Sequence, residues 1–282
     1  EFLSAYRNED NYTVWLEIAS GLSRIEQLMA KKPTTSGGIP QKAVNNLNSL
    51  TIDLFFPVFS RLGWTKKENE AHADSLLRSL VISRLGRAEE KDIIQEARNK
   101  YFIIKKGGKV NPDIRGAIYV VIASNGGQKE YKQMLKMYKG ENLHEEKNRI
   151  GNALGDFKNK KILSSACAFA MSKNVRIQDS IGILSSVASN SLGRDIWWNF
   201  VKKNWKTLVS RYGEGGLNLG RAFRAIGGSA ENKHFKGIKA FFSTHEAPGA
   251  KRAIDQLLER LKGNAEWLKR DGKIIERFLK NY

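Results

Sequence analysis

Cysteine, proline and histidine are scarce in this sequence, and long apolar runs are missing. Its 282 residues include one cysteine, Cys167, which lies in the apolar stretch 166–170. A single cysteine excludes an intrachain disulfide, so we expect a buried, unreactive thiol and a cytoplasmic location, where thiols stay reduced. No segment approaches the about 20 consecutive apolar residues that a membrane helix needs, and no signal sequence opens the chain. We therefore expect no membrane partner.

The charge of the chain is strongly one-sided. Lysine and arginine number 48 against 29 aspartates and glutamates, which gives a formal charge of +19. A hydrophobic content of 41% is ample for a buried core, so global disorder is excluded. So much positive charge attracts polyanions, and a basic helical-repeat module that binds nucleic acid or a protein partner is therefore an alternative function.

Apolar residues recur in steps of three and four along most of the chain, which predicts helices. The segment 248–268 carries one such stripe. Helix boundaries are also marked: Asn111 precedes a first-turn proline, Thr65 and Glu68 have capping-box spacing, and Gly63 is placed as a C-cap. Sustained period-two alternation is lacking. We predict an all-α fold of about sixteen short helices joined by loops of a few residues.

Helix pairs in units of about 30 to 40 residues are typical of an α-solenoid of the HEAT or armadillo kind. Such an antiparallel helix-pair superhelix has a concave surface. The stretch 31–38 is the most linker-like segment, but we interpret it as a connection within one array. We therefore expect residues 1–282 to form a single domain.

Motifs for catalysis are incomplete. His144-Glu145 begins like the HExxH zinc helix, yet Asn148 stands where the second histidine belongs. His245-Glu246 fails at Gly249 in the same way. The two other histidines, 72 and 234, stand alone and are expected to be surface or hydrogen-bonded side chains. Because glycine-rich phosphate loops and the GxSxG elbow are also lacking, we expect this chain to hold no active site and no metal or other cofactor of its own.

Two polar constellations remain. Arg176 and Asp179 lie three residues apart at a predicted helix start, where they form either an ion pair that fixes the turn or a cluster that faces a ligand. Trp197 and Trp205 alternate with lysines such as Lys202, which suggests a stacking platform for nucleic acid. The tryptophans share one helical stripe that the lysines mostly avoid, which favours an aromatic core stripe beside a solvated basic face.

A set of short fragments carries a family resemblance over nearly the whole chain. The fragments, in chain order, are Tyr12–Trp15, Leu62–Trp64, Asn111–Arg115 with Tyr119, Glu145–Ile150 with Ala153–Gly155, Val175–Asp179, Asn204–Trp205, Arg211–Tyr212, Phe241–His245 with Ala247–Pro248, Ala253–Gln256 and Asn264–Asp271. Together they resemble the C-terminal helical domain of the gluzincin aminopeptidases that use HExxH and GAMEN motifs. The puromycin-sensitive and tricorn-interacting types are the most similar.

The resemblance implies an all-helical bowl that closes over a separate catalytic domain, in a protein that removes N-terminal residues from peptides. This sequence contains neither HExxH nor GAMEN. The zinc, the general base and the glutamate that binds the peptide N-terminus would therefore belong to a catalytic domain outside these residues. Because the chain begins with Glu1, we expect a fragment of a longer polypeptide that hydrolyses nothing alone. Its partners would be its own catalytic domain and the peptide, with nucleic acid less expected.

The role that the resemblance suggests is enclosure of the chamber and substrate binding. A basic concave wall attracts the carboxylates of a peptide, and guanidinium groups hold a carboxylate through two parallel hydrogen bonds. Arg176 and Arg149 are our candidates for this contact, with Gln178 and Asp179 as residues that position them. For each of the four, a helix-packing role is an open alternative.

Overall fold

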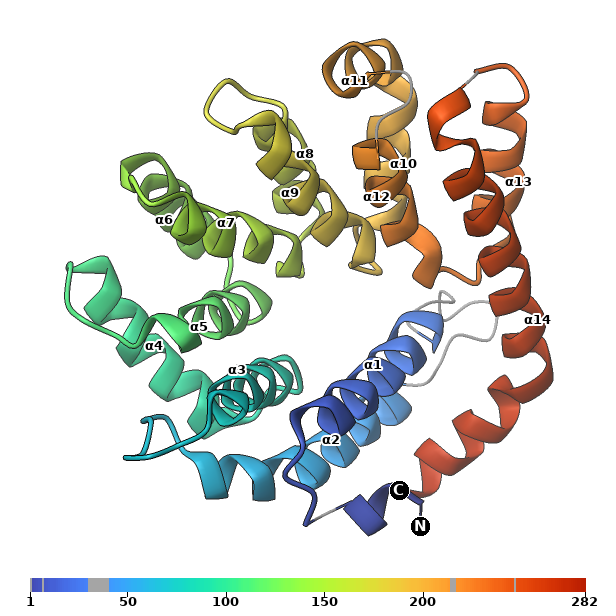
Figure 1. The fold of residues 1–282 in the computed structure, drawn as a ribbon. Coiled ribbons are helices and arrows are strands. Elements are labelled where there is room, and N and C mark those ends of the chain that lie inside the picture. Colours follow the sequence, from blue (N-terminus) through green and yellow to red (C-terminus); the bar gives the residue numbers. More distant parts are fainter. Residues whose placement is uncertain (1, 7, 30–40, 214–216, 246) are drawn as a thin grey trace.

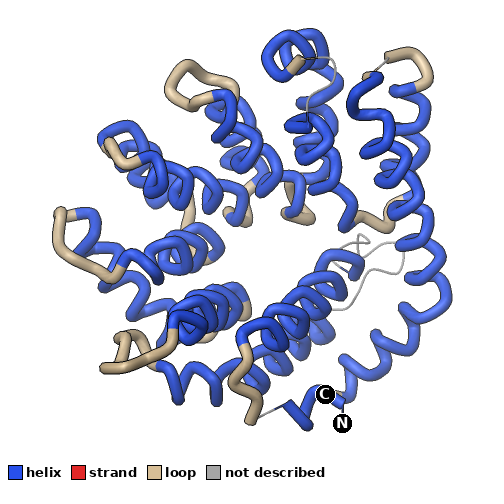
Figure 2. The backbone as a smooth tube through the Cα atoms, viewed as in Figure 1, coloured by secondary structure: helices blue, strands red, loops and turns tan. Residues whose placement is uncertain are grey.

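Helices make up most of the computed structural model, which describes residues 2–6, 8–29, 41–213, 217–245 and 247–282. The linker-like stretch 31–38 lies outside the described residues. In the described part there is no strand (Figure 2), and the all-α prediction is confirmed.

Fourteen α-helices and four short 3-10 helices are described: η1 (Phe2–Tyr6), α1 (Tyr12–Met29), α2 (Gln41–Leu62), α3 (His72–Arg87), α4 (Lys91–Lys105), α5 (Pro112–Ser124), α6 (Gln128–Gly140), α7 (His144–Ala153), η2 (Leu154–Asp156), α8 (Lys160–Ala170), α9 (Ile177–Ser189), α10 (Arg194–Lys203), α11 (Trp205–Tyr212), α12 (Leu217–Ala225), η3 (Ile226–Gly228), α13 (Asn232–Phe242), η4 (Pro248–Ala250) and α14 (Lys251–Asn281).

The chain alternates between two layers of helices. One layer, which we call the inner layer, consists of α1, α3, α5, α7, α9, α12 and α14. Each of these helices packs against the next helix of the same layer. The remaining helices form the outer layer, in which α4, α6 and α8 make no extensive contact with one another within the described part. Because the inner helices pack closely and the outer helices are spread apart, the array curves, and the helices radiate like spokes (Figure 1). This is the helix-pair superhelix of an α-solenoid.

The last helix closes the array into a ring. α14 runs for 31 residues and packs against α1, α2, α12 and α13. The amide of Asn46 on α2 donates a 2.7 Å hydrogen bond to the carbonyl of Leu279 near the end of α14. The two chain ends lie together as a result (Figure 1). None of the helices in the described residues is long and apolar enough to cross a membrane.

Asparagine side chains join the inner helices where they converge. In each case the side-chain amide of an asparagine donates to the backbone carbonyl of a glycine in the last turn of another inner-layer helix or in the 3-10 turn that follows it. The bonds are Asn125 to Gly86 (2.8 Å), Asn190 to Gly155 (2.7 Å) and Asn264 to Gly227 (2.7 Å). The glycines permit the close approach, since a Cβ on Gly86 would lie 2.2 Å from a methyl group of Val121. These bonds add acceptor contacts at carbonyls near helix ends, where the intrahelical bonds stop.

The predicted helix boundaries meet different outcomes. Asn111 caps α5, because its side-chain oxygen accepts from the backbone N–H of Asp113 at 3.0 Å. Gly63 ends α2 in the left-handed region at φ 61°, as expected. The prediction of a helix start at Thr65 is wrong, since α3 begins at His72. Asn69, at φ 59°, keeps the intervening residues in a turn.

The tryptophan stripe forms core. Trp197 is 0% exposed and Trp205 8% exposed, and both contact the ring of Phe223 on α12. Lys202 is exposed on the other side of α10. The core interpretation is therefore confirmed, and a stacking platform is excluded for these two rings. Cys167 is also buried, and burial raises the pKa of its thiol to about 12, as the expectation of an unreactive thiol requires.

Candidate functional site

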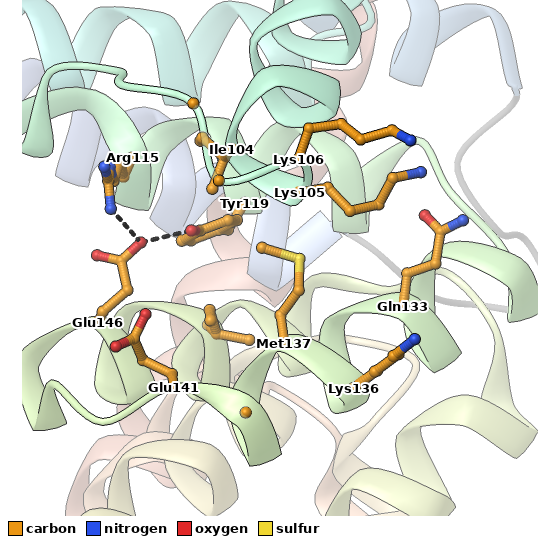
Figure 3. Close-up of a pocket in the computed structure, with 14 residues that line it drawn as sticks. Ile104, Lys105, Lys106, Arg115, Tyr119, Gln133, Lys136, Met137, Glu141 and Glu146 are labelled. Atoms are coloured by element: carbon orange, nitrogen blue, oxygen red, sulfur yellow. Dashed lines mark hydrogen bonds and ion pairs between the residues drawn. The ribbon is translucent and has the colours of Figure 1, made fainter.

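A buried carboxylate organises the polar groups between α5 and α7. Glu146, on the first turn of α7, has a side chain that is 2% exposed. It accepts hydrogen bonds from the Tyr119 hydroxyl, from Arg115 Nη1 at 3.4 Å and from Arg149 Nη1 at 2.8 Å. The Arg115 and Tyr119 contacts are drawn in Figure 3. Burial, together with the bond to Glu146, raises the pKa of Tyr119, so its hydroxyl remains a donor. The network leaves Glu146 paired with two guanidinium groups.

The sequence builds this network by helical spacing. Arg115 and Tyr119 are one turn apart on α5, and Glu146 and Arg149 are one turn apart on α7. The two helices pack against each other in the inner layer, which brings the four side chains together. Arg149 also bonds to Glu145, so both of its terminal nitrogens are engaged within its own helix.

A cavity of about 670 Å³ lies beside this network. Its walls come from the end of α4, the turn that follows it, α5, α6 and the start of α7. The lysines Lys105, Lys106 and Lys136 and the amide of Gln133 surround it (Figure 3). In the part of the chain that the structure describes, none of the three lysines has a carboxylate partner; Lys105 and Lys106 lie 5.5 and 5.7 Å from the Phe102 ring centroid. The cavity therefore faces unneutralised ammonium groups.

The predicted pair Arg176 and Asp179 lies at the start of α9. Arg176 Nε donates to Asp179 Oδ2 at 2.6 Å and Nη2 donates to Oδ1 at 3.1 Å. These bonds hold the first turn of α9, as the structural alternative expects, and they raise the pKa of the guanidinium. The Arg176 side chain is still 41% exposed, and Gln178 beside it is exposed. Within the described residues, no hydrogen bond or ion pair joins this pair to Arg149, so the predicted residues form two separate clusters.

A serine, a histidine and an aspartate are also brought together, although sequence spacing gave no sign of it. His234 Nε2 lies 2.9 Å from Asp195 Oδ1, and Nδ1 lies 2.7 Å from Ser229 Oγ. Ser229 is 0% exposed, so it has no access to a substrate. Its hydroxyl accepts from the backbone N–H of Glu231 beside the start of α13. Ser229 and His234 are buried and Asp195 is half-exposed, so the trio is a structural network at the edge of the core. Burial lowers the pKa of His234, although Asp195 opposes the shift. The expectation of a hydrogen-bonded histidine is confirmed.

The residues present do not fit a zinc site. Over the described ranges, no group of three histidine, cysteine, aspartate or glutamate side chains is placed to hold a metal ion. His144 lies at the exposed start of α7, and Asn148 occupies the position one turn later. A catalytic zinc needs three protein ligands, so no chemical step is assigned to a metal in this chain.

The residues that sequence reasoning missed are those that line the cavity. Arg115, Tyr119 and Glu146 lie within the fragments that carry the family resemblance, and their helical spacing would have placed them on facing stripes. Lys105 and Lys136 gave no signal, because exposed lysines on amphipathic helices are common. Only the packing of α4 and α5 beside α6 shows that they share a cavity.

Comparison with known proteins agrees with the resemblance. The model of the ERAP1-like C-terminal domain family matches residues 1–263. Aminopeptidase M1-B of Oryza sativa subsp. japonica is 29% identical over an alignment of 273 residues that covers 94% of this chain and 30% of that protein. Aminopeptidase M1 of Arabidopsis thaliana is 27% identical over 94% of the chain and 30% of its own length. Aminopeptidase 2, mitochondrial, of Saccharomyces cerevisiae is 24% identical over 99% of the chain and 29% of its own length. The chain thus spans about 30% of each relative.

Proposed function

This chain belongs to the ERAP1-like C-terminal domain family, and from that membership we propose that it is the C-terminal helical domain of a larger zinc aminopeptidase. In this role residues 1–282 act as one domain that encloses the active-site chamber and helps to bind the peptide. The observation that carries the proposal is coverage, because two plant aminopeptidases match 94% of the chain with only 30% of their own length.

Catalysis belongs to the rest of the polypeptide in this proposal. The zinc, the general base and the group that binds the peptide N-terminus lie there, since the residues that the structure describes do not fit a zinc site. The single cysteine, which is buried, supports a reducing cytoplasmic location.

The ring of helices supports the role in enclosure. The inner layer is continuous from α3 to α14, and α14 returns to α1 and α2. A continuous layer of packed helices limits the access of bulk water and large substrates to a chamber that it covers. Peptides then reach the chamber, whereas folded proteins are excluded by size.

Arg176 remains our main candidate for binding a peptide carboxylate. Its Nε and Nη2 bond to Asp179, and in the described structure Nη1 has no partner. The half-exposed guanidinium is held in place by Asp179 and still offers a free donor edge. Arg149 is less available because both of its terminal nitrogens bond to glutamates on α7. Gln178 is also exposed in the first turn of α9 and stays a candidate for positioning the ligand.

The test compares substrates in the full-length aminopeptidase. Arg176→Ala should raise KM about fivefold for a ten-residue peptide and leave KM for leucine p-nitroanilide unchanged, since the small amide does not reach α9. Lys161→Ala removes one positive charge from an exposed position on outer helix α8 and is the matched control. Equal changes for both substrates would contradict the binding role. Zinc-dependent turnover by residues 1–282 alone would contradict the proposal that catalysis belongs to the rest of the polypeptide.

A further inference from the structure

The cavity beside Glu146 has the size and lining of a ligand site. Its volume of about 670 Å³ lies within the range of roughly 300 to 1,000 Å³ that small-molecule and short-peptide sites occupy. Apolar side chains form part of the wall, including Ile104, Met137 and Ile150. Figure 3 shows Met137 between the lysines on one side and the Glu146 network on the other. A ligand that fills this space therefore meets apolar surface and charge together.

The charge at the cavity is positive. Glu146 is the buried carboxylate of the wall, and it is paired with Arg115 and Arg149. Lys105, Lys106 and Lys136 have no such partner among the described residues. Three ammonium groups around one cavity attract an anion at short range.

Two further groups distinguish between classes of anion. Gln133 offers an amide that donates and accepts. Glu141 accepts from the backbone N–H groups of Asn142 and Leu143 through Oε1, at 2.7 and 2.9 Å, and in the described structure its Oε2 has no partner. A free carboxylate oxygen can accept a hydrogen bond from a peptide N–H, a donor that a phosphodiester backbone lacks. The lining therefore favours a peptide over nucleic acid.

We propose that this cavity binds an acidic peptide segment. The peptide carboxylates bond to Lys105, Lys106 and Lys136, an apolar side chain packs on Met137, and the backbone bonds to Gln133 and Glu141. The proposal concerns a site at the outer ends of α4 to α7, and it does not rest on the proposed function. Because binding is measured on residues 1–282, its failure leaves the aminopeptidase experiment unaffected.

The test uses an amidated, fluorescein-labelled hexapeptide of four glutamates and two leucines, with binding followed by fluorescence anisotropy at 50 and 150 mM NaCl. The triple variant Lys105→Gln, Lys106→Gln, Lys136→Gln should weaken binding at least about tenfold, since each exposed charge pair adds a modest increment. Met137→Gln should weaken binding of this probe but not of a hexaglutamate. Circular dichroism establishes that each variant is folded.

The matched control removes the same charge elsewhere on the same surface. Lys129, Lys132 and Lys139 are exposed on α6 and do not line the cavity. Their triple replacement by glutamine should change affinity less than twofold. Equal loss in both variants would show a diffuse basic surface and would overturn the site, as would no binding of the acidic probe by the wild type. A 12-base-pair DNA duplex that binds in place of the peptide, through the cavity lysines, would overturn it in favour of nucleic acid.

Discussion

The ion pair between Arg78 and Glu70 offers the sharpest test of the stability argument. Arg78 is 0% exposed in its side chain, and Glu70 is 5% exposed. Arg78 Nη1 donates to Glu70 Oε1 at 2.6 Å, and Nε donates to the carbonyl of Gly63 at 3.0 Å. The guanidinium thus fastens the turn after α2 to α3. Glu70→Gln removes the charge of one partner and leaves a buried cation with weaker acceptors.

The expected loss follows from the pKa of Glu70. Hydrogen bonds from Arg78, opposed by burial, lower this pKa from 4.5 to about 2. At 1.36 kcal/mol per pKa unit that shift corresponds to about 3 kcal/mol, and water near the edge of the fold reduces it to about 2 kcal/mol. The unfolded chain takes up its proton near pH 4.5 and the folded chain only near pH 2. The contribution is therefore complete above about pH 5 and is lost as the pH falls toward 2.

Urea denaturation followed by circular dichroism measures the effect. At pH 7 Glu70→Gln should lower the free energy of unfolding by about 2 kcal/mol, and at about pH 3 by less than half of that. Glu68→Gln, at an exposed position two residues earlier, is the control and should cost less than about 0.5 kcal/mol. A difference in the free energy of unfolding between Glu70→Gln and wild type that does not change with pH would refute the ion-pair account.

Three other predictions concern buried groups. Glu146→Gln should lower the free energy of unfolding by about 2 kcal/mol, because two guanidinium groups lose their carboxylate, whereas Glu145→Gln, on the exposed side of α7, should cost less than about 0.5 kcal/mol in the same urea titration. Because burial lowers the pKa of His234, the unfolded chain binds its proton first, and stability should fall as the pH drops below 6.5; His234→Gln should flatten this dependence between about pH 7.5 and 5.5. Ellman's reagent should find no reactive Cys167 thiol in the native protein and one thiol after unfolding in urea.

The helices could be predicted because burial on one side of each helix leaves a periodic pattern. The stripe over 248–268 marks most of α14, and Asn111 marks the start of α5. α14 nevertheless continues to Asn281 through Gly263 and Gly272, although a glycine inside a helix costs about 1 kcal/mol relative to alanine. Packing against α1 and α2 offsets that cost. The apolar spacing resumes at 274–279, so the length of α14 depends both on this pattern and on the tertiary contacts that hold the helix together across its glycines.

The candidate site could be predicted only in its helix-local parts. The Arg176–Asp179 pair and the Arg149–Glu146 pair follow from spacing within one helix. The cavity could not be predicted, since Lys105 and Lys136 belong to different helix pairs and each looks like an ordinary solvated lysine. Similarly, Thr65 looked like a helix cap because its capping-box spacing is local, whereas the turn that displaces the helix start is held by Arg78 on α3.

The distribution of charge explains why net charge alone does not identify the ligand. Outer helix α6 carries four lysines and one glutamate, and outer helix α13 carries three lysines and no acidic residue. Inner helices α5 and α7 have equal numbers of acidic and basic residues. Exposed charges are screened beyond about 8 Å at physiological salt, so the lysines of the outer layer add little attraction inside the ring. A peptide must therefore be held by individually positioned groups, such as Arg176 at the start of α9 or the lining of the cavity beside Glu146. The comparison of the cavity lysines with the other lysines of α6 is therefore decisive, because the two triple variants remove the same charge from different positions.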